Sequence, residues 1–310
     1  MVTREVIQEV AEGLWRCHFT ALGGPCELHL GCDDRRLTQQ AAAAVEAETR
    51  RIEAKYSRYQ PDSVLSQLNA RAGLACPIDA ETHQLLNFAW LCFQQSDGLF
   101  DISSGVLQQA WDFRQPRLPE PQTLQPLLRR IGLERMQLQS DQVQIPADME
   151  LDLGGLGKEY AVDRAAAVCQ QLGIRSGLID FGGDIQVLGP KADGSPWLVA
   201  VRNPAQPDQP LAGLPVYQGG VASSGNYERG FDLDGRRYCH ILNPRTGYPV
   251  DYWASVTVVS GSALLAGCLS TIAMLKQATA LAWLQQQKQA FLAVTTDGRQ
   301  HRWPDQPSVE

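Results

Sequence analysis

Apolar residues follow two periods along this chain, and each period predicts one kind of element. A repeat at every second residue is typical of a half-buried strand, whereas repeats at three and four residues are typical of a helix with one buried face. The helical period predicts helices over 37–59, 82–95, 158–172, 262–276 and 279–287. Alternating or short apolar runs bounded by turn residues predict strands over 14–22, 25–30, 143–145, 150–153, 176–181, 185–188, 197–202, 216–223, 238–242, 254–259 and 291–295.

The order of these elements indicates the fold class. Strands come in neighbouring pairs, helices lie apart from them, and the sequence shows neither regular strand-helix-strand alternation nor an internal repeat, which favours an α+β fold. Residues 114–125 are rich in proline and resemble a linker, but the segment is short, so we expect a single domain over 1–310. Residues 62–69 are expected to form a short turn, and the proline-rich segment 203–215 a surface loop.

One stretch joins a strand pattern to a helix pattern through glycines. The apolar run ends at Asp152, the glycines Gly154, Gly155 and Gly157 follow, and Lys158 begins the helical period. Glycines let backbone amides approach an anion, and the helix start and Lys158 add positive charge. Glycines also serve simply to make a turn, so a phosphate cradle and a plain strand-to-helix turn both remain open on these residues.

Composition narrows the classes of partner and compartment. A net charge of -7 argues against a general nucleic-acid or anionic-membrane binder, so an anionic ligand would need a local site. The sequence shows neither a signal-peptide pattern over 1–11 nor an uninterrupted apolar run long enough for a membrane span, and we expect a cytoplasmic protein. The eight cysteines are scattered without a CxxC pair, which predicts small buried residues rather than disulfides or zinc ligands.

Four further groups carry polar chemistry, and each has a plainer structural explanation. Residues 101–105 could bind a polar ligand or cap a helix, 182–184 could admit a ligand ring or form a bulge, and 223–227 could bind phosphate or form a hairpin turn. His240 could act as a general base, with Arg245 as an oxyanion clamp, although a histidine at a strand end is often structural.

Taken in order, these blocks resemble the ApbE-type FAD:protein FMN transferases, which attach FMN covalently to target proteins. The resemblance covers nearly the whole chain. The matching blocks are 21–26 (ALGGPC), 57–69 (SRYQPDSVLSQLN), 100–103 (FDIS), 152–158 (DLGGLGK), 182–185 (GGDI), 221–225 (VASSG), 240–247 (HILNPRTG) and 255–259 (SVTVV) leading to Thr271.

The resemblance implies an architecture, a reaction and a set of site residues. The fold would be an antiparallel or mixed sheet packed with helices, of the T-fold-like kind, and a target threonine hydroxyl would attack the FMN phosphorus of FAD and release AMP. Magnesium on the pyrophosphate would support the transfer, with Gly155 and Thr271 as metal-site residues and His240 as the base. The positions that match FAD contacts are Leu22, Tyr59, Asp101, Ile102, Ser103, Asp152, Lys158 and Ile241.

Three positions depart from the family pattern, and two of them concern the metal. The helix that carries Thr271 has Gly267 where the family places a magnesium-binding Asp, and magnesium usually needs one or two carboxylates. Glu159 follows Lys158 where a glycine is common, but the sequence does not fix the direction of its side chain. Asn243 replaces the usual Asp of the 240–247 block, which removes a negative charge.

These departures leave alternative functions open. The first is an active FAD:protein FMN transferase that uses FAD as donor, a threonine-bearing target protein as acceptor, and a magnesium site without its usual carboxylate. The second is a catalytically impaired FAD-binding protein. The third, FAD pyrophosphate hydrolysis, is disfavoured by Tyr59, which stands where the transferases place a tyrosine.

Overall fold

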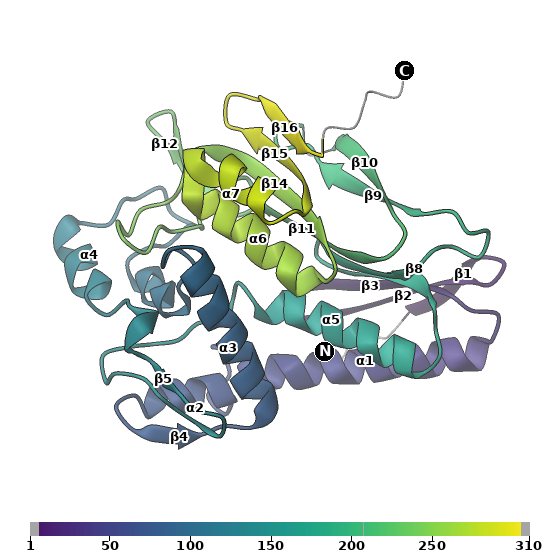
Figure 1. The fold of residues 1–310 in the computed structure, drawn as a ribbon, viewed down its shortest axis with the longest axis horizontal. Helices are drawn as coiled ribbons and strands as arrows, with labels where there is room; N and C mark the ends of the chain where they lie inside the picture. Colours follow the sequence, from purple (N-terminus) through teal and green to yellow (C-terminus); the bar gives the residue numbers. More distant parts are fainter. Residues whose placement is uncertain (1–5, 207, 305–310) are drawn as a thin grey trace.

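A nine-stranded sheet forms the centre of the molecule (Figure 1), and every strand pairing in it is antiparallel. The structure is a computed structural model that describes residues 6–206 and 208–304. In sheet order the strands are β1 (Val6–Ala11), β2 (Leu14–Ala21), β3 (Gly24–Gly31), β7 (Ser176–Phe181), β8 (Asp184–Gly189), β11 (Gly219–Gly225), β14 (Trp253–Ser260), β15 (Ala290–Thr295) and β16 (Gln300–Trp303). The predicted α+β class is confirmed.

Helices cover one face of this sheet. The α-helices are α1 (Arg35–Tyr56), α2 (Val64–Ala70), α3 (Ala80–Gln95), α4 (Pro121–Leu128), α5 (Gly157–Gln171), α6 (Ala263–Lys276) and α7 (Ala280–Gln286), and the short 3-10 helices are η1 (Ile102–Gln109), η2 (Leu133–Arg135) and η3 (Gln277–Thr279). In Figure 1, α1, α5 and α6 lie side by side in front of the strands, and they also contact one another in that order. The sheet, α5 and α6 therefore meet at the centre of the fold.

Helix α6 is apolar almost all the way round, which is why it lies inside the core. Its predicted N-cap is confirmed, because the Ser262 side chain accepts a hydrogen bond from the Leu265 amide. The helical stretch 263–286 is long and apolar enough for a membrane span, although the sequence predicted none. Within the apolar 18-residue window of this stretch, 56% is buried in the fold, where α6 packs against β11 and β14. Burial of this kind is typical of a core helix.

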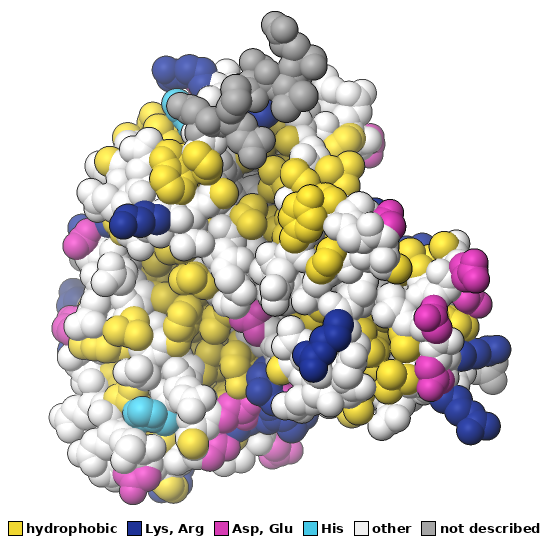
Figure 2. All heavy atoms as spheres, turned by 45° about the vertical axis from the view of Figure 1, so that its right-hand side comes forward, with side chains coloured by type: hydrophobic (Ala, Val, Ile, Leu, Met, Phe, Trp, Pro, Cys, Tyr) yellow, Lys and Arg dark blue, Asp and Glu magenta, His cyan; other side chains and the backbone are white. Residues whose placement is uncertain are grey.

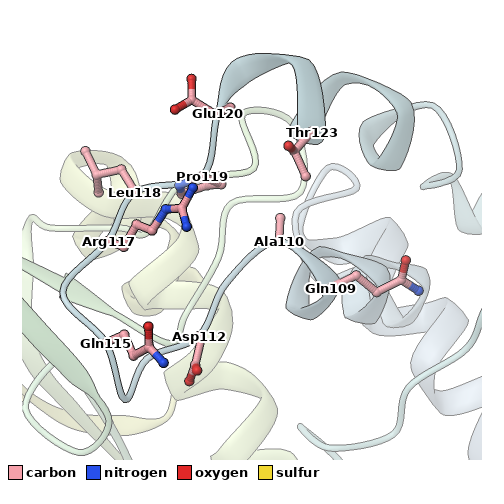
Figure 3. A pocket seen from close by; sticks show the side chains of 9 residues that line it. All are labelled: Gln109, Ala110, Asp112, Gln115, Arg117, Leu118, Pro119, Glu120 and Thr123. Atoms are coloured by element: carbon pink, nitrogen blue, oxygen red, sulfur yellow. The ribbon is translucent and has the colours of Figure 1, made fainter.

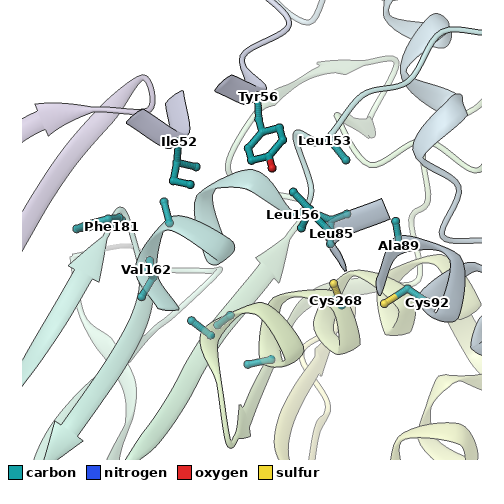
Figure 4. Packing of buried hydrophobic residues seen from close by; sticks show 14 of the residues in the cluster. Ile52, Tyr56, Leu85, Ala89, Cys92, Leu153, Leu156, Val162, Phe181 and Cys268 are labelled. Atoms are coloured by element: carbon teal, nitrogen blue, oxygen red, sulfur yellow. The ribbon is translucent and has the colours of Figure 1, made fainter. Parts of the chain in front are cut away.

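The main core lies between the helices and the sheet. Figure 4 shows Leu156 and Leu85 pointing toward each other, with Tyr56 close by and Cys92 next to Cys268. Seven of the eight cysteines are buried, as the sequence predicted. The core therefore holds together helices from distant parts of the chain, among them α1, α3, α5 and α6.

Smaller sheets flank the central one. They are β9 (Trp197–Arg202) with β10 (Pro210–Val216), β12 (Gly230–Leu233) with β13 (Arg236–Cys239), and β4 (Ala75–Pro77) with β6 (Gln142–Gln144) and β5 (Gln137–Leu138). The hairpin of β9 and β10 packs a separate apolar cluster, which includes Trp197 and Val199, against Val187 of the central sheet. This cluster lies apart from the main core.

Several predicted boundaries are wrong for physical reasons. Residues 210–216 form β10 rather than a loop, because an edge strand tolerates prolines that donate no hydrogen bond. Residues 64–70 form α2 rather than a turn, capped by the Ser63 side chain. The predicted strands 216–223 and 238–242 shift, since β11 begins at Gly219 and β13 ends at Cys239, and the predicted helix 37–59 ends at Tyr56.

The predicted strand 150–153 is also wrong, and its hydrogen bonds explain why. Leu151 exchanges two backbone bonds with the Asn69 side chain, at 2.8 and 2.9 Å, and the Asp152 amide donates to the Ile102 carbonyl at 2.7 Å. A side chain and a loop thus satisfy the backbone groups that a neighbouring strand would otherwise bind.

Candidate active site

The glycine stretch places the first turn of α5 at the centre of the site. The residue before the helix, Leu156, provides no side-chain cap, although the Gly157 amide already donates to the Leu153 carbonyl at 2.7 Å. The Lys158 ammonium lies 2.9 Å from the Asp184 carboxylate and 3.5 Å from the Gly182 carbonyl. An uncapped helix start beside a lysine is suited to bind an anion.

The turn between β7 and β8 faces Lys158. Both of its glycines have positive backbone φ, 62° at Gly182 and 95° at Gly183, which glycine adopts without strain. The Gly183 amide donates to the Asp180 carboxylate at 2.7 Å, and this bond fixes the turn. A Cβ at Gly182 would lie 3.8 Å from the Lys158 nitrogen, so a side chain at this position would contact the cation.

Charge is unevenly balanced around Lys158. Burial opposes protonation, but the Asp184 and Glu159 carboxylates outweigh it and raise the pKa of Lys158. Burial in turn raises the pKa of both carboxyl groups. The Asp184 carboxylate raises the pKa of Glu159 further, and Lys158 opposes the effect of burial on both groups. One lysine therefore serves two buried acids. The sequence singled out Glu159 and Lys158, whereas Asp184 was noted only as part of the glycine turn.

The hydroxyl groups of β11 and α6 form a cluster near this turn of α5. The Ser224 hydroxyl lies 2.8 Å from that of Ser270 and 2.9 Å from that of Thr271. Residues 223–225 are part of β11, paired with β14, so the hairpin-turn explanation for this segment is wrong. Ser270 also donates to the Gly267 carbonyl at 2.9 Å.

His240 lies directly after β13, with its Nδ1 3.3 Å from the Arg229 carbonyl. His240 is exposed, yet partial desolvation by the neighbouring protein atoms, with the charges of Arg229 and Lys158, lowers the pKa of His240. A neutral imidazole within the electrostatic reach of Lys158 can accept a proton. Its neighbour Ile241 is 9% exposed and belongs to the core.

Asp101 and Ser103 are committed to internal hydrogen bonds. Asp101 caps η1 by accepting from the Ser103 amide and hydroxyl, at 2.7 and 2.6 Å, and from the Leu133 amide at 3.1 Å. The capping explanation for 101–105 is therefore confirmed. The Ile102 carbonyl accepts from the Asp152 amide, so the structure brings these two groups of predicted FAD contacts together.

The Asp152 carboxylate is held from several sides. Arg58 donates to it at 2.6 Å, Gln108 at 3.1 Å and the Gly154 amide at 2.8 Å. Tyr59, which follows Arg58 in the chain, is 82% exposed, and the Arg58 guanidinium lies 5.8 Å from the centre of its ring. An exposed ring beside a bound arginine can stack on a flat ligand.

The remaining predicted residues occupy turns. Leu22 has φ 54° in the turn between β2 and β3, and its amide donates to the Glu53 carboxylate at 2.8 Å. Asn243 accepts from the Arg245 amide at 2.9 Å, which makes it a turn former. The Arg245 guanidinium donates to the Asp97 carbonyl, and its role as an oxyanion clamp stays a prediction.

Metal-ligating groups are sparse in the part of the chain that the structure describes. Within residues 6–206 and 208–304, His, Cys, Asp and Glu side chains do not gather in threes in a way that could hold a metal ion. Thr271 and Gly155 offer a hydroxyl and a backbone carbonyl, and two buried carboxylates lie on α5 and β8. Magnesium keeps several waters and binds substrate phosphates, so few protein ligands are compatible with it.

Two surface hollows lie away from these residues. One, of about 270 Å³, is lined by residues 109–123 before and at the start of α4 (Figure 3). The other, of about 290 Å³, lies along β1, β2 and β3. On the face seen in Figure 2, Lys and Arg side chains are spread among acidic and apolar ones. Neither hollow contains a predicted site residue, so the site is defined by the side chains that converge on the start of α5.

Comparison with known proteins points to one family. A family model described as the ApbE family matches residues 22–294. The FAD:protein FMN transferase of Haemophilus influenzae is 29% identical over 256 residues, which cover 77% of this chain and 74% of the relative. That of Salmonella typhimurium is 32% identical over 221 residues, which cover 67% of this chain and 63% of the relative. The chain thus spans about two thirds of the curated relatives it matches.

Solved structures give the same answer. The ApbE protein of Thermotoga maritima superposes with a TM-score of 0.86 at 28% identity, covering 93% of this chain and 96% of that one. The apo form of the flavinyl transferase ApbE of Pseudomonas stutzeri gives 0.83 at 26% identity, covering 96% and 95%. The described fold is therefore similar to theirs over almost its full length.

Proposed function

This chain belongs to the ApbE family, and we propose on that basis that it is an FAD:protein FMN transferase. The observation that carries the proposal is the start of α5, which has no side-chain cap and where the Lys158 ammonium lies 3.5 Å from the Gly182 carbonyl, with His240 within electrostatic reach. This arrangement offers positive charge for a pyrophosphate and a base for an acceptor hydroxyl.

The reaction balances with the groups present. A threonine oxygen of the target forms a bond to the FMN phosphorus of FAD, the bond from that phosphorus to the bridging oxygen breaks, and AMP leaves with the electron pair. His240 accepts the hydroxyl proton, which is possible near neutral pH because its pKa is lowered. Lys158 and the α5 amides balance the negative charge on the phosphates.

The predicted FAD contacts divide into polar and apolar roles. Lys158 would bind the pyrophosphate, Tyr59 would stack on a ring of the nucleotide, and Leu22, Asp101, Ile102, Ser103, Asp152 and Ile241 would shape the rest of the pocket. Magnesium, when bound, would neutralise phosphate charge, and Thr271 and the Gly155 carbonyl would hold it. The buried cysteines are typical of a reducing compartment, which supports cytoplasmic acceptors.

A mass measurement tests the transferase. The purified chain is incubated with FAD, magnesium and a threonine-containing acceptor protein, and the acceptor mass and released AMP are followed. We expect an FMN increment on the acceptor with one AMP per transfer. AMP and free FMN without an increment would instead indicate a hydrolase, and FAD binding with neither product would indicate the impaired FAD-binding protein.

A variant tests the role of His240. His240→Gln should lower the transfer rate by about 10²- to 10⁴-fold, the range for loss of a general base, and leave FAD binding intact. Because the pKa of His240 is lowered from 6.5, the acidic limb of the natural chain's rate profile should lie below pH 6.5. An acidic limb that persists unchanged in His240→Gln would remove His240 from this role.

A further inference from the structure

Two residues on different helices compete for one space inside the site. Gly267 lies in α6 and Glu159 in the first turn of α5. A Cβ placed on Gly267 would lie 2.6 Å from the Glu159 Cγ, 3.2 Å from its Oε1 and 3.3 Å from its carboxylate carbon. Real Cβ atoms do not approach other atoms this closely, so the Glu159 side chain occupies the volume that a side chain at Gly267 would need.

Glu159 is buried without enough hydrogen bonds. It is 8% exposed, and its Oε2 has no hydrogen-bond partner in the described structure. Its neighbour Asp184 is 4% exposed, and the Oδ2 of Asp184 makes only the 2.9 Å ionic contact with Lys158. Burying an ionised carboxylate costs several kcal/mol unless a charge and hydrogen bonds compensate. When both groups are ionised, one lysine between them leaves negative charge that a cation would balance.

Helix geometry places hydroxyl ligands beside this carboxylate. Gly267, Ser270 and Thr271 are three and four residues apart, so they share one face of α6. Glu159 Oε1 lies against Gly267 on this face, and the Ser224 hydroxyl bridges Ser270 and Thr271 from β11. Carboxylate and hydroxyl oxygens from different elements therefore converge between α5 and α6, and these are the ligands that a hard divalent cation prefers.

We propose that Glu159 is a metal ligand in this chain, reaching from α5 into the space that Gly267 leaves open and placing its carboxylate beside Thr271. The inference rests on the proposed function, because the bound phosphates of FAD would complete the coordination of the ion. It assigns the metal carboxylate to a different helix from the one on which the family resemblance places it. Glycine at 267 is then a requirement of the site, since a larger side chain would displace Glu159.

A shared proton between Glu159 and Asp184 is the competing explanation. The two carboxyl groups lie close enough to interact as hydrogen-bond partners. The other charged groups that act on Glu159 are few: Lys158 on its own helix is the only cation among its main interactions, and β8 contributes only Asp184. Under this explanation the pair needs no metal, and the natural chain and a variant at Glu159 would bind Mn²⁺ with the same affinity.

The test measures metal binding directly. Mn²⁺ is titrated into protein saturated with FAD, and free Mn²⁺ is followed by its electron paramagnetic resonance signal. We expect Glu159→Gln to weaken Mn²⁺ binding by about 10- to 100-fold or more, since even outer-shell changes at metal sites have effects of this size. Glu81→Gln, which alters a fully paired carboxylate facing the other side of α5, is the matched control and should bind Mn²⁺ like the natural chain.

Exchanging the two positions sharpens the test. Glu159→Gly alone and Gly267→Asp alone should both bind Mn²⁺ at least 10-fold more weakly than the natural chain, the first because the ligand is lost and the second because the side chains collide. The double variant Glu159→Gly, Gly267→Asp should recover binding to within about threefold, a difference of less than 1 kcal/mol. Two measurements confirm that each variant folds: its thermal unfolding curve in the absence of metal, and its affinity for FAD.

The outcomes separate this inference from the proposed function. Unchanged Mn²⁺ affinity in a folded Glu159→Gln variant would overturn the inference while leaving FMN transfer untouched. A folded double variant that binds no better than Glu159→Gly would overturn the exchange of position. Conversely, the natural chain could fail to transfer FMN while Glu159→Gln still weakens Mn²⁺ binding. That pair of results would support the inference and reject the transferase.

Discussion

Two groups of carboxylates lie on two sides of α5, and their surroundings differ. On the outer side, Glu81 accepts hydrogen bonds from Arg51 at 2.7 Å, Lys55 at 2.6 Å and the Tyr160 hydroxyl at 2.8 Å. On the inner side, Glu159 and Asp184 are more deeply buried, yet the Glu159 Oε2 has no hydrogen-bond partner and the Asp184 Oδ2 has only its ion pair with Lys158. The outer group is complete in itself, whereas the inner one is not.

This difference separates structural charges from functional ones. A carboxylate with three strong donors gains nothing from a ligand, so the outer group serves to join α1, α3 and α5. A buried carboxylate short of partners raises the free energy of the empty site, and a ligand that supplies the missing charge lowers it. Changes in the inner group should therefore affect binding and rate, and changes in the outer group should affect stability.

Among changes in these two groups, the largest effect should follow removal of the inner cation. Lys158→Met should lower the rate of FMN transfer by about 10²- to 10³-fold, the usual cost of one charge-stabilising group. Lys55→Met removes the corresponding cation from the outer group and should leave the rate within about twofold. The measurement is AMP release at saturating FAD, and equal loss in both variants would break the distinction between the two groups.

Stability should respond in the opposite pattern. Glu81→Gln should lower the free energy of unfolding by about 1–3 kcal/mol, because its donors lose a charged acceptor. At pH values above the raised pKa of Glu159, Glu159→Gln should raise the free energy of unfolding of the metal-free protein, because a buried charge with an unpartnered oxygen is removed. Urea unfolding in the presence of a chelator measures both, and a destabilised Glu159→Gln variant would show that the inner group also holds the fold together.

The two groups should also respond to pH with opposite signs. The Arg51 hydrogen bonds lower the pKa of Glu81 from 4.5 to about 2, with smaller contributions from Lys55 and Tyr160 and with burial acting in the opposite direction. The stabilising contribution of Glu81 is therefore present above pH 4.5 and is lost as the pH falls toward 2. Burial raises the pKa of Glu159 and Asp184, so the metal-free protein loses stability as the pH rises from ordinary carboxyl values through the raised ones. Unfolding curves at several pH values for the natural chain, Glu81→Gln and Glu159→Gln should show each slope disappear in its own variant.

The smallest effect should come from an exposed ion pair outside both groups. Arg236 and Asp251 lie 2.6 Å apart with side chains 59% and 46% exposed. Arg236→Ala should change the free energy of unfolding by about 0.5 kcal/mol or less, because solvent screens such pairs. A loss as large as that of Glu81→Gln would mean that pairing alone, without partial burial, determines stability here.

Local patterns predicted most of the elements and failed where long-range contacts decide. The Ser262 cap and the limits of α6 follow from neighbouring residues, and both are confirmed. The expected strand at 150–153 fails because Asn69, more than eighty positions away in sequence, binds its backbone. The strand β10 was missed because two prolines dominate its local pattern, while its pairing with β9 depends on the hairpin as a whole.

For the candidate site, residue types were predictable and their relations were not. The glycine stretch, Lys158 and His240 stand out in the sequence because their chemistry is recognisable in short motifs. Asp184 was not singled out, because only its burial beside Lys158 gives it a role. The predicted contacts of Asp101 and Ser103 with FAD stay predictions, and their side chains are already engaged in capping.

The sequence by itself determined the α+β class, the family resemblance and the fact that a carboxylate is missing at Gly267 and an extra one is present at Glu159. It left these two departures as separate facts, because more than a hundred residues lie between them. Only the tertiary structure brings α5 against α6, so that the Glu159 side chain fills the space beside Gly267. The physical reason is that packing excludes two side chains from one volume, and this exclusion acts through space rather than along the chain.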